Sequence, residues 1–286
     1  MCDLRDITDG IGDFIGDVVG FVEDVVEVVV DVVENVVGWL IPQPEIPDFG
    51  DDYAEQQAQG ILVNKFRANA SIPVVYGTRK VGGNVVFLET SGTDNQYLYM
   101  ALVLSEGEIN SVETLFVNEN QVTLSGALTD GTQRTVASSD SNFFADSSLI
   151  TVEAHLGTDS QSASTLLSTL TSWTSNHRLR GLAYLALRFE WNADKFGSLP
   201  KVQAIIKGRK VYNPNLDSTV TGGSGSHRAD TSSTWEYSDN PILQLLDYLR
   251  NDRFGMGITN SYFDSNFADW QTATDVCDTN ITPFSG

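Results

Sequence analysis

The amino-acid sequence predicts a mainly β protein with a few α-helices, an α+β chain whose β-rich part follows a long N-terminal helix. Three observations favour this fold class. Residues 11–36 repeat apolar side chains with a helical period, and from about residue 60 β-branched and aromatic residues form short runs between turns. A helix start stands near residue 240. With 286 residues, the chain is long enough for one large or two ordinary domains.

The first predicted element is a valine-rich, acidic, amphipathic helix within residues 1–42. Its apolar seam recurs on a heptad at Ile11, Ile15, Val18, Val22, Val25, Val29, Val32 and Val36, and the acids follow a stripe on the opposite side. Each valine costs about 0.5 kcal/mol in helix propensity and returns about 1.5 kcal/mol or more when buried. This helix should therefore form only where its apolar face is covered. Acids at short intervals exclude a transmembrane helix at neutral pH.

Two kinds of cover stay open for this helix. It packs either on its own domain or in a bundle of identical helices around a symmetry axis, and the regular seam favours the bundle. An interfacial membrane helix is less favoured, because such helices usually carry lysine and arginine on their polar face. Residues 43–57 follow as a proline-rich linker, which Pro42, Pro44 and Pro47 make stiff and extended.

Residues 58–220 are predicted to form a β-rich domain. Both faces of the strand at 97–104 are apolar, which predicts burial on both sides, and the same holds for the strand within 178–192. Two strands are expected around "GTRKVGG" in 71–90, and a hairpin turn is expected around Asn118 and Asn120. Residues 148–161 are expected to form a strand followed by a loop, and residues 163–175 a short helix. In 199–214 we expect a strand, a Lys-Gly turn and a second short strand.

The C-terminal part is predicted to be helical. Residues 221–237 are rich in glycine and serine and are expected to be a flexible loop. The segment 238–286 begins with a clear helix start, in which Ser238, Asp239 or Asn240 caps the helix and Pro241 fits its first turn. The expected buried stripe is Leu245, Leu246 and Leu249, and Gly255 and Gly257 end the helix; a second helix over 265–278 places Phe267, Trp270, Ala273, Thr274 and Cys277 on one side.

The charge balance limits the classes of partner that we expect the chain to bind. The formal net charge is -21, and residues 1–60 hold fifteen carboxylates against a single basic residue, Arg5. No basic stripe exists, so sequence-specific binding to duplex nucleic acid is not expected. The two cysteines, Cys2 and Cys277, stand at opposite ends of the chain and imply no disulfide framework.

Motifs that carry chemistry are missing from the sequence. His155, His177 and His227 have no second histidine or cysteine at ligand spacing, which favours structural histidines over a zinc site. No GxSxG, HExxH or phosphate-binding loop occurs. An Asx-type turn explains Asp159 better than a cation site does. We therefore expect no catalytic, metal or cofactor site, and we do not expect the protein to be an enzyme.

Several segments, in order and spacing, resemble the tail tip attachment proteins of lambda-like siphophages, the J or host-specificity family. They are "RFEWNADKFGSLPKVQAIIKGRKVYNP", "WEYSDNPILQLLDYLRNDRFGMGI" and "FADWQTATDVCD". Upstream, "IPVVYGTRKVGG" and "YLYMALVLSEGEINSVETLFVN" resemble the putative phage tail protein branch of the same family. The residues that carry the resemblance are interpreted as fold and interface residues, namely Tyr76, Gly77, Gly208, Asn240, Pro241, Tyr248, Arg253 and Gly255.

The resemblance implies a homotrimeric baseplate hub of tail-hub-like β domains at the distal tip of the phage tail in the virion. Such a hub closes the tail tube and contacts the distal tail protein, the tape measure protein and other tail tip or receptor-binding proteins. Family members run longer, so the chain is expected to be either a fragment of a longer product or a short hub component. The valine helix is not shared by the best-known members, and three copies would bring their apolar faces together on the axis.

Two other functions stay open. In one, the N-terminal helix leaves the trimer and inserts into the host membrane during infection, which makes the chain envelope-active. In the other, the chain is a free-standing β-rich adhesin that binds carbohydrate as a monomer. The hub is the leading hypothesis, with host recognition and DNA delivery as its purpose.

Overall fold

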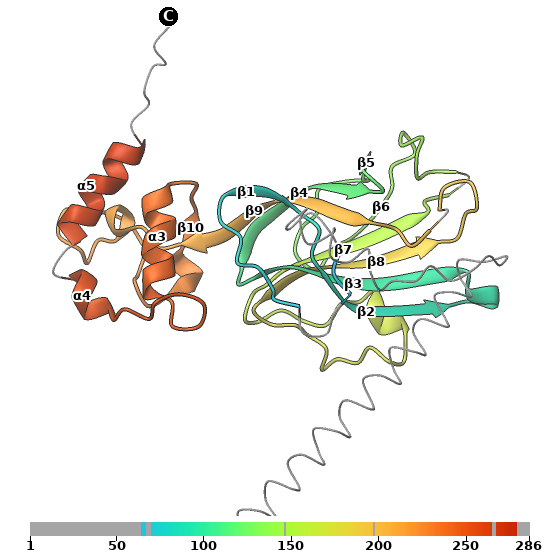
Figure 1. The fold of residues 1–286 in the computed structure, drawn as a ribbon, viewed down its shortest axis with the longest axis horizontal. Helices are drawn as coiled ribbons and strands as arrows, with labels where there is room; N and C mark the ends of the chain where they lie inside the picture. The colour runs from blue at the N-terminus through green and yellow to red at the C-terminus, as the bar shows by residue number, and fades with distance from the viewer. Residues whose placement is uncertain (1–63, 67–69, 146, 197, 265–266, 279–286) are drawn as a thin grey trace, which may run out of the picture.

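The computed structural model describes residues 64–66, 70–145, 147–196, 198–264 and 267–278. The predicted N-terminal helix, its seam from Ile11 to Val36 and the proline-rich linker lie outside these residues. Within them the fold is mainly β with few helices, as predicted, with the β-sheets at one end and the helices at the other (Figure 1).

The described strands form two antiparallel sheets. Sheet I has the order β1-β9-β4-β5, with β10 also paired to β9, and sheet II has the order β2-β3-β8-β7-β6. The strands are β1 (Thr78–Val81), β2 (Asn84–Ser91), β3 (Tyr97–Glu106), β4 (Ile109–Val117), β5 (Asn120–Val122), β6 (Gln133–Thr135), β7 (Ile150–Leu156), β8 (Leu182–Glu190), β9 (Val202–Val211) and β10 (Glu236–Tyr237).

The main hydrophobic core lies between the two sheets, as in a β-sandwich. Sheet I contributes inward residues from β4 and β9, and sheet II contributes inward residues from β3, β7 and β8. The core residues with no exposed surface include Leu98, Met100, Leu102, Ile109, Ile150, Leu185, Leu187, Phe189, Val202 and Ile206. Burial of this apolar surface supplies the main driving force for the fold.

The outer face of sheet II is also covered. Residues 158–181, here named the cover segment, place Leu166, Leu167 and Trp173 against Tyr99 of β3 and Tyr184 of β8. The prediction that β3 and β8 are apolar on both faces is therefore confirmed. The cover segment itself differs from prediction, because residues 163–175 hold only the 3₁₀ turn η3 (Leu167–Thr169) and no α-helix.

Hydrogen bonds of side chains hold this segment in place of a helical ladder. Glu153 of β7 accepts from the N–H groups of Thr165 and Leu166, and the Ser168 and Thr169 hydroxyls donate to backbone carbonyls of the segment. Serine and threonine side chains offer the backbone such local alternatives to a helix.

Of three further predictions in the β domain, one is confirmed and two are wrong. The hairpin turn is confirmed, because Asn118 and Glu119 both have positive φ between β4 and β5. The supposed turn "GTRKVGG" contains a strand, since its residues 78–81 form β1. The supposed Lys-Gly turn in 199–214 is also wrong, because β9 runs unbroken through Gly208.

The helical unit follows β9. It consists of η4 (Pro214–Leu216), η5 (Ser232–Thr234), α3 (Pro241–Arg250), α4 (Asn260–Asp264) and α5 (Phe267–Asp278). Its own apolar cluster comprises Tyr212, Leu246, Phe263 and Phe267. The predicted start of α3 is confirmed, because the Asn240 side chain accepts from the Ile242 N–H and Pro241 occupies the first turn.

The buried faces of the helices depart from prediction. On α3 the buried residues are Leu243, Leu246 and Asp247, whereas Leu245 is 45% exposed. α3 ends at Arg250, several residues before the glycines expected to end it. On α5 Phe267 and Thr274 are buried, whereas Cys277 is exposed. The prediction for α3 was wrong for a physical reason. Asp247 occupies a buried position where an apolar residue is expected, because its carboxylate has hydrogen-bond partners on the sheet.

Candidate functional site

The candidate site is the joint between sheet I and α3, defined by Tyr76, Arg209 and Asp247. Asp247 lies on α3, Arg209 on β9, and Tyr76 just before β1. One carboxylate oxygen of Asp247, Oδ2, accepts from the Tyr76 hydroxyl at 2.5 Å and from Arg209 Nε at 2.9 Å. The side chains of Arg209 and Asp247 are only 15% and 4% exposed. Burial and the neighbouring Asp247 carboxylate both raise the pKa of Tyr76, so its hydroxyl keeps its proton.

A close backbone contact brings Tyr76 to this position. The Gly208 N–H donates to Gly77 O at 2.9 Å, and the Arg209 N–H donates to Val75 O at 2.7 Å. A Cβ on Gly208 would lie 2.1 Å from Val75 O, so only glycine lets the two backbones approach this closely. The chain at 75–77 thus lies beside β9, where the Tyr76 hydroxyl reaches Asp247 of α3.

The loop that follows α3 provides a second link. Arg253 Nε lies 2.7 Å from a carboxylate oxygen of Glu106 at the end of β3. The Arg209 guanidinium stacks over the Phe254 ring at 5.2 Å from its centroid. Gly255 sits against the end of α3, where a Cβ would lie 1.7 Å from Tyr248 O. The loop therefore folds back on α3 and also contacts the sandwich, through Arg253 and Phe254.

The structure gathers most of the sequence-predicted motif residues around this joint. Tyr76, Gly77 and Gly208 form its sheet side, and Arg253 and Gly255 form the returning loop. Asn240 and Pro241 start α3, and the Asn240 amide donates to Thr274 O at 3.0 Å and to Asp278 Oδ1 at 2.7 Å, which ties α3 to α5. Tyr248 contributes its backbone carbonyl, whereas its side chain is 43% exposed.

Sequence reasoning missed Arg209, Asp247 and Glu106. A signal for Asp247 existed, because it stands between Leu246 and Leu249 within the apolar period of α3. A charged residue at such a position requires a buried partner of opposite charge. For Arg209 and Glu106 the sequence holds no comparable signal.

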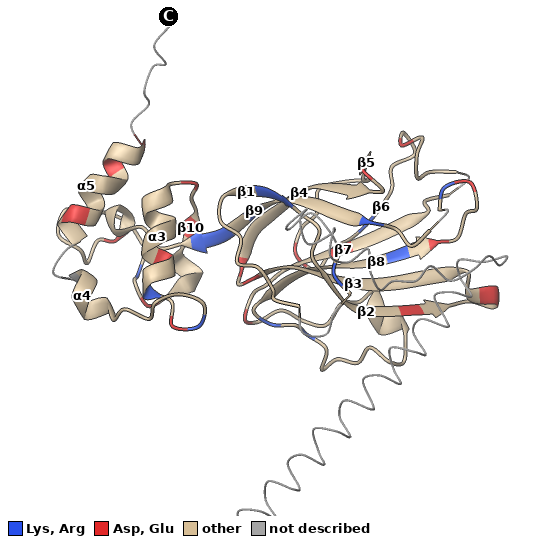
Figure 2. Ribbon diagram, viewed as in Figure 1, with Lys and Arg blue, Asp and Glu red and all other residues tan. Residues whose placement is uncertain are grey.

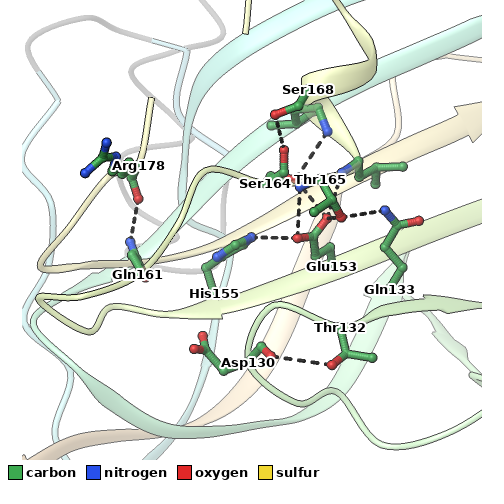
Figure 3. Close-up of polar contacts among 12 residues, drawn as sticks. Asp130, Thr132, Gln133, Glu153, His155, Gln161, Ser164, Thr165, Ser168 and Arg178 are labelled. Carbon is green, nitrogen blue, oxygen red and sulfur yellow. Dashed lines mark hydrogen bonds and ion pairs between the residues drawn. The ribbon is translucent and has the colours of Figure 1, made fainter. Parts of the chain in front are cut away.

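The cover segment is held by a second buried polar cluster (Figure 3). Glu153 of β7 has no exposed surface, and its carboxylate accepts from Ser164 Oγ, Thr165 Oγ1 and the N–H groups of Thr165 and Leu166 at 2.8–3.1 Å. His155 Nε2 lies 3.0 Å from the same carboxylate, and its ring stacks on Tyr184. Burial opposes ionisation, but these hydrogen bonds lower the pKa of Glu153 to about 2.

The glycine- and serine-rich loop also holds a buried cluster. Asp217 Oδ2 accepts from the Tyr212 hydroxyl at 2.9 Å, and Arg228 lies 3.0 Å from Asp217 Oδ1. His227 is 2% exposed, its Nδ1 accepts from the Asn213 N–H, and burial lowers the pKa of its ring. The flexibility of residues 221–237 stays a prediction from composition; in the structure Ala229 and Trp235 pack against the apolar cluster of the helical unit, and most of the other residues are exposed.

The hydrogen bonds and ion pairs of these clusters hold segments of the fold together. In the described ranges, no three carboxylate, imidazole or thiol groups gather closely enough to hold a metal ion. None of the described helices has the length and apolar character that a bilayer crossing requires. The joint connects the helical unit to the β-sandwich through ionic, aromatic and close backbone contacts.

One of the comparisons with known proteins finds similarity to a phage baseplate protein. The chain matches no protein-family model. It is similar to the baseplate hub protein pb3 of Escherichia phage T5, with 25% identity over 232 residues. The match covers 67% of this chain and 23% of pb3, so the chain spans less than a quarter of that relative's length. Among solved structures it is similar to a chain of the virion of a native gene transfer agent particle, at 16% identity and a TM-score of 0.37, covering 50% of this chain and 28% of that one.

The similarity to pb3 supports the coarser part of the resemblance inferred from sequence, which is to phage tail and baseplate proteins. The narrower resemblance, to the J family, stays a prediction.

Replacing Gly208 with alanine tests the close approach at the joint. Because the new Cβ would overlap Val75 O, we expect the free energy of unfolding to fall by about 3 kcal/mol or more. Urea denaturation of the full chain measures this change. The matched control is Gly131→Ala, whose Cβ would meet nothing within 4 Å, so only its positive φ costs stability, about 1 kcal/mol. Equal losses in the two variants would contradict the account of Gly208.

Proposed function

We propose that this chain is a structural, non-enzymatic component of a phage tail baseplate, where it serves as a hub protein. The observation that carries the proposal is the similarity to the T5 baseplate hub protein pb3 over 232 residues. The joint supports it physically. A hub has to pass forces between its parts, and the buried contacts of Tyr76, Arg209 and Asp247 fasten the helical unit to the sandwich.

In finer detail, three copies surround the tail axis at the distal tip of the virion. Their N-terminal seams meet on the axis, and the ring closes the tail tube and links it to the distal tail protein, the tape measure protein and receptor-binding parts. The heptad seam of residues 11–36 supports the threefold arrangement. Exposed apolar side chains of the helical unit support contacts with partner proteins, namely Leu245, Tyr248, Met256, Tyr262 and Val276.

The mass of the full-length chain in solution tests this proposal. The expected result is a trimer of about three times the 31.2 kDa chain mass, measured by light scattering coupled to size exclusion. Val22→Glu with Val29→Glu should convert the trimer into monomers, because two charges then enter each apolar seam. The control pair Asp24→Asn with Asp31→Asn changes the opposite stripe and should keep the trimer.

A well-behaved monomer of the unaltered chain would contradict the trimeric hub and favour the adhesin. The envelope-active alternative concerns residues 1–42, and leakage from liposomes caused by a peptide of residues 8–42 would favour it.

A further inference from the structure

The outer face of sheet I differs from that of sheet II. Val202, Ala204 and Ile206 of β9 point into the core, so the alternate positions point outward. Strand register extends this outward face across the sheet to Gln203, Ile205 and Lys207 on β9, Thr114 and Phe116 on β4, and Thr78 and Lys80 on β1. The described residues form three apolar clusters, and none of them lies on this face. Sheet II has a cover segment; sheet I has no counterpart among the residues described.

This face, named here the lysine face, combines cations with apolar surface (Figure 2 shows the basic residues on β1 and β9). Lys80 Nζ lies 4.0 Å from the centroid of the Phe116 ring, and Lys207 Nζ lies 5.9 Å from that of Tyr237. Lys207 meets Glu113 only loosely, at 3.8 Å, with both side chains 40% exposed. Lys80 takes part in no ion pair with any described residue. The face therefore has cationic and aromatic groups ready for an acidic partner.

The rim of the face repeats this bias. Lys65 and Lys201 are exposed and have no ion pair among the described residues. By contrast, Arg209 and Lys210 farther along β9 are neutralised by Asp247 and Glu108. The positive charge without an ion-pair partner thus lies on Lys65 and Lys201 near the start of β9 and on Lys80, which stands opposite Ile205 in the middle of β9.

The chain enters the described structure near the start of β9. Asn64 is buried, and its side chain bonds both the N–H and the carbonyl of Val202 at 2.7 Å and also the Gly82 carbonyl. It is thereby fixed between the start of β9 and the end of β1. The residues just before it, 45–55, hold five carboxylates and no base: Glu45, Asp48, Asp51, Asp52 and Glu55.

We propose that the acidic segment 45–55 of the same chain docks on the lysine face of sheet I. The reach allows it, because the nine residues from 55 to 64 span up to about 30 Å when extended. Lys207 stands only about 17 Å along β9 from Val202, where Asn64 is anchored. Charge complementarity selects this occupant, since five acids without a base can reach a face on which Lys80 has no ion pair among the described residues and Lys207 meets Glu113 only loosely. This docking would orient the helix predicted for residues 1–42 relative to the sandwich, and it does not depend on the hub proposal.

Hydrogen exchange of the full-length chain, followed by mass spectrometry, tests the docking. Backbone amides of residues 45–60 are expected to exchange about fivefold faster in Lys80→Glu/Lys207→Glu than in the unaltered chain, with no change in the β3 amides. Lys80→Gln/Lys207→Gln should give a smaller acceleration in the same direction. Adding Asp51→Lys/Asp52→Lys to the Lys→Glu pair should restore protection, because the charges are then exchanged. Arg178→Glu/Arg180→Glu, on the cover segment, is the control and should leave residues 45–60 unchanged.

Unaltered exchange of residues 45–60 in both lysine variants would overturn the proposal. Carbodiimide cross-linking of mixed light and heavy chains decides the source of the segment. Cross-links from residues 45–55 to Lys80 or Lys207 within one isotopic form support docking in the same chain. Cross-links between light and heavy chains in equal share would assign the face to a second copy and overturn docking within the chain.

Discussion

Replacing Asp247 with alanine is expected to lower the free energy of unfolding by about 3–5 kcal/mol. The loss is large because one buried carboxylate oxygen serves both the Tyr76 hydroxyl and Arg209 Nε. Without it, a mostly buried guanidinium and a buried hydroxyl lose their partner, and a buried charge without a counter-ion costs more than the pair contributes. Urea denaturation measures the loss, and hydrogen exchange should show α3 opening before β3 and β8.

The matched control for this prediction is Asp252→Ala, which removes an exposed carboxylate just after α3 and should change stability by about 0.5 kcal/mol or less. A double-mutant cycle with Arg209→Met isolates the pair, and its coupling should exceed about 1 kcal/mol. If Asp247→Ala cost no more than the control, the joint would not hold the helical unit to the sheet.

Replacing Glu153 with glutamine should lower the free energy of unfolding by about 3–5 kcal/mol. The carboxylate accepts from four donors of the cover segment, two of them backbone N–H groups. A glutamine amide has the same shape, but its NH₂ end is a donor that faces other donors. The cover segment should therefore detach from the outer face of sheet II. Loss of the near-ultraviolet circular dichroism of Trp173, which packs against Phe87, reports the detachment.

The pH dependence gives this prediction a second readout. The folded pKa of Glu153 is about 2, below the 4.5 of an ordinary glutamate, so the unfolded chain binds the proton more readily. The stability that Glu153 contributes is then fully present above pH 4.5 and is lost as the pH falls toward 2. In Glu153→Gln this part of the acid dependence should disappear, whereas Glu119→Gln, in the exposed β4–β5 turn, should keep it. An unchanged acid profile in Glu153→Gln would contradict the role of the carboxylate.

Much of the β fold could be predicted from local patterns. Apolar residues on both faces of residues 97–104 predicted burial of β3 on both sides, and the structure places one face on the core and the other under the cover segment. The Asn118 turn and the Asn240–Pro241 helix start were also predictable, because their backbone conformations depend on side chains that are adjacent in sequence.

The errors arose where distant residues decide the local structure. Gly208 was interpreted as a turn, but it is a glycine of a continuous strand that Val75 O approaches closely. Residues 163–175 have a helical apolar pattern, yet they form only the turn η3, and Glu153, which stands earlier in the sequence, holds them on sheet II by accepting from the Thr165 and Leu166 N–H groups. The joint was missed as a unit because its members are up to 171 residues apart. No window of sequence can reveal such a contact.

The central proposal is that this chain is a tail hub subunit repeated around the tail axis. A density map of the phage particle to which the proposal assigns the chain, determined by electron cryomicroscopy, tests it most directly. The account predicts three copies of the two-sheet sandwich around the axis at the distal tip, with residues 11–36 meeting on that axis. A map in which this sandwich is absent from the tail tip, or present there as a single copy, would contradict it.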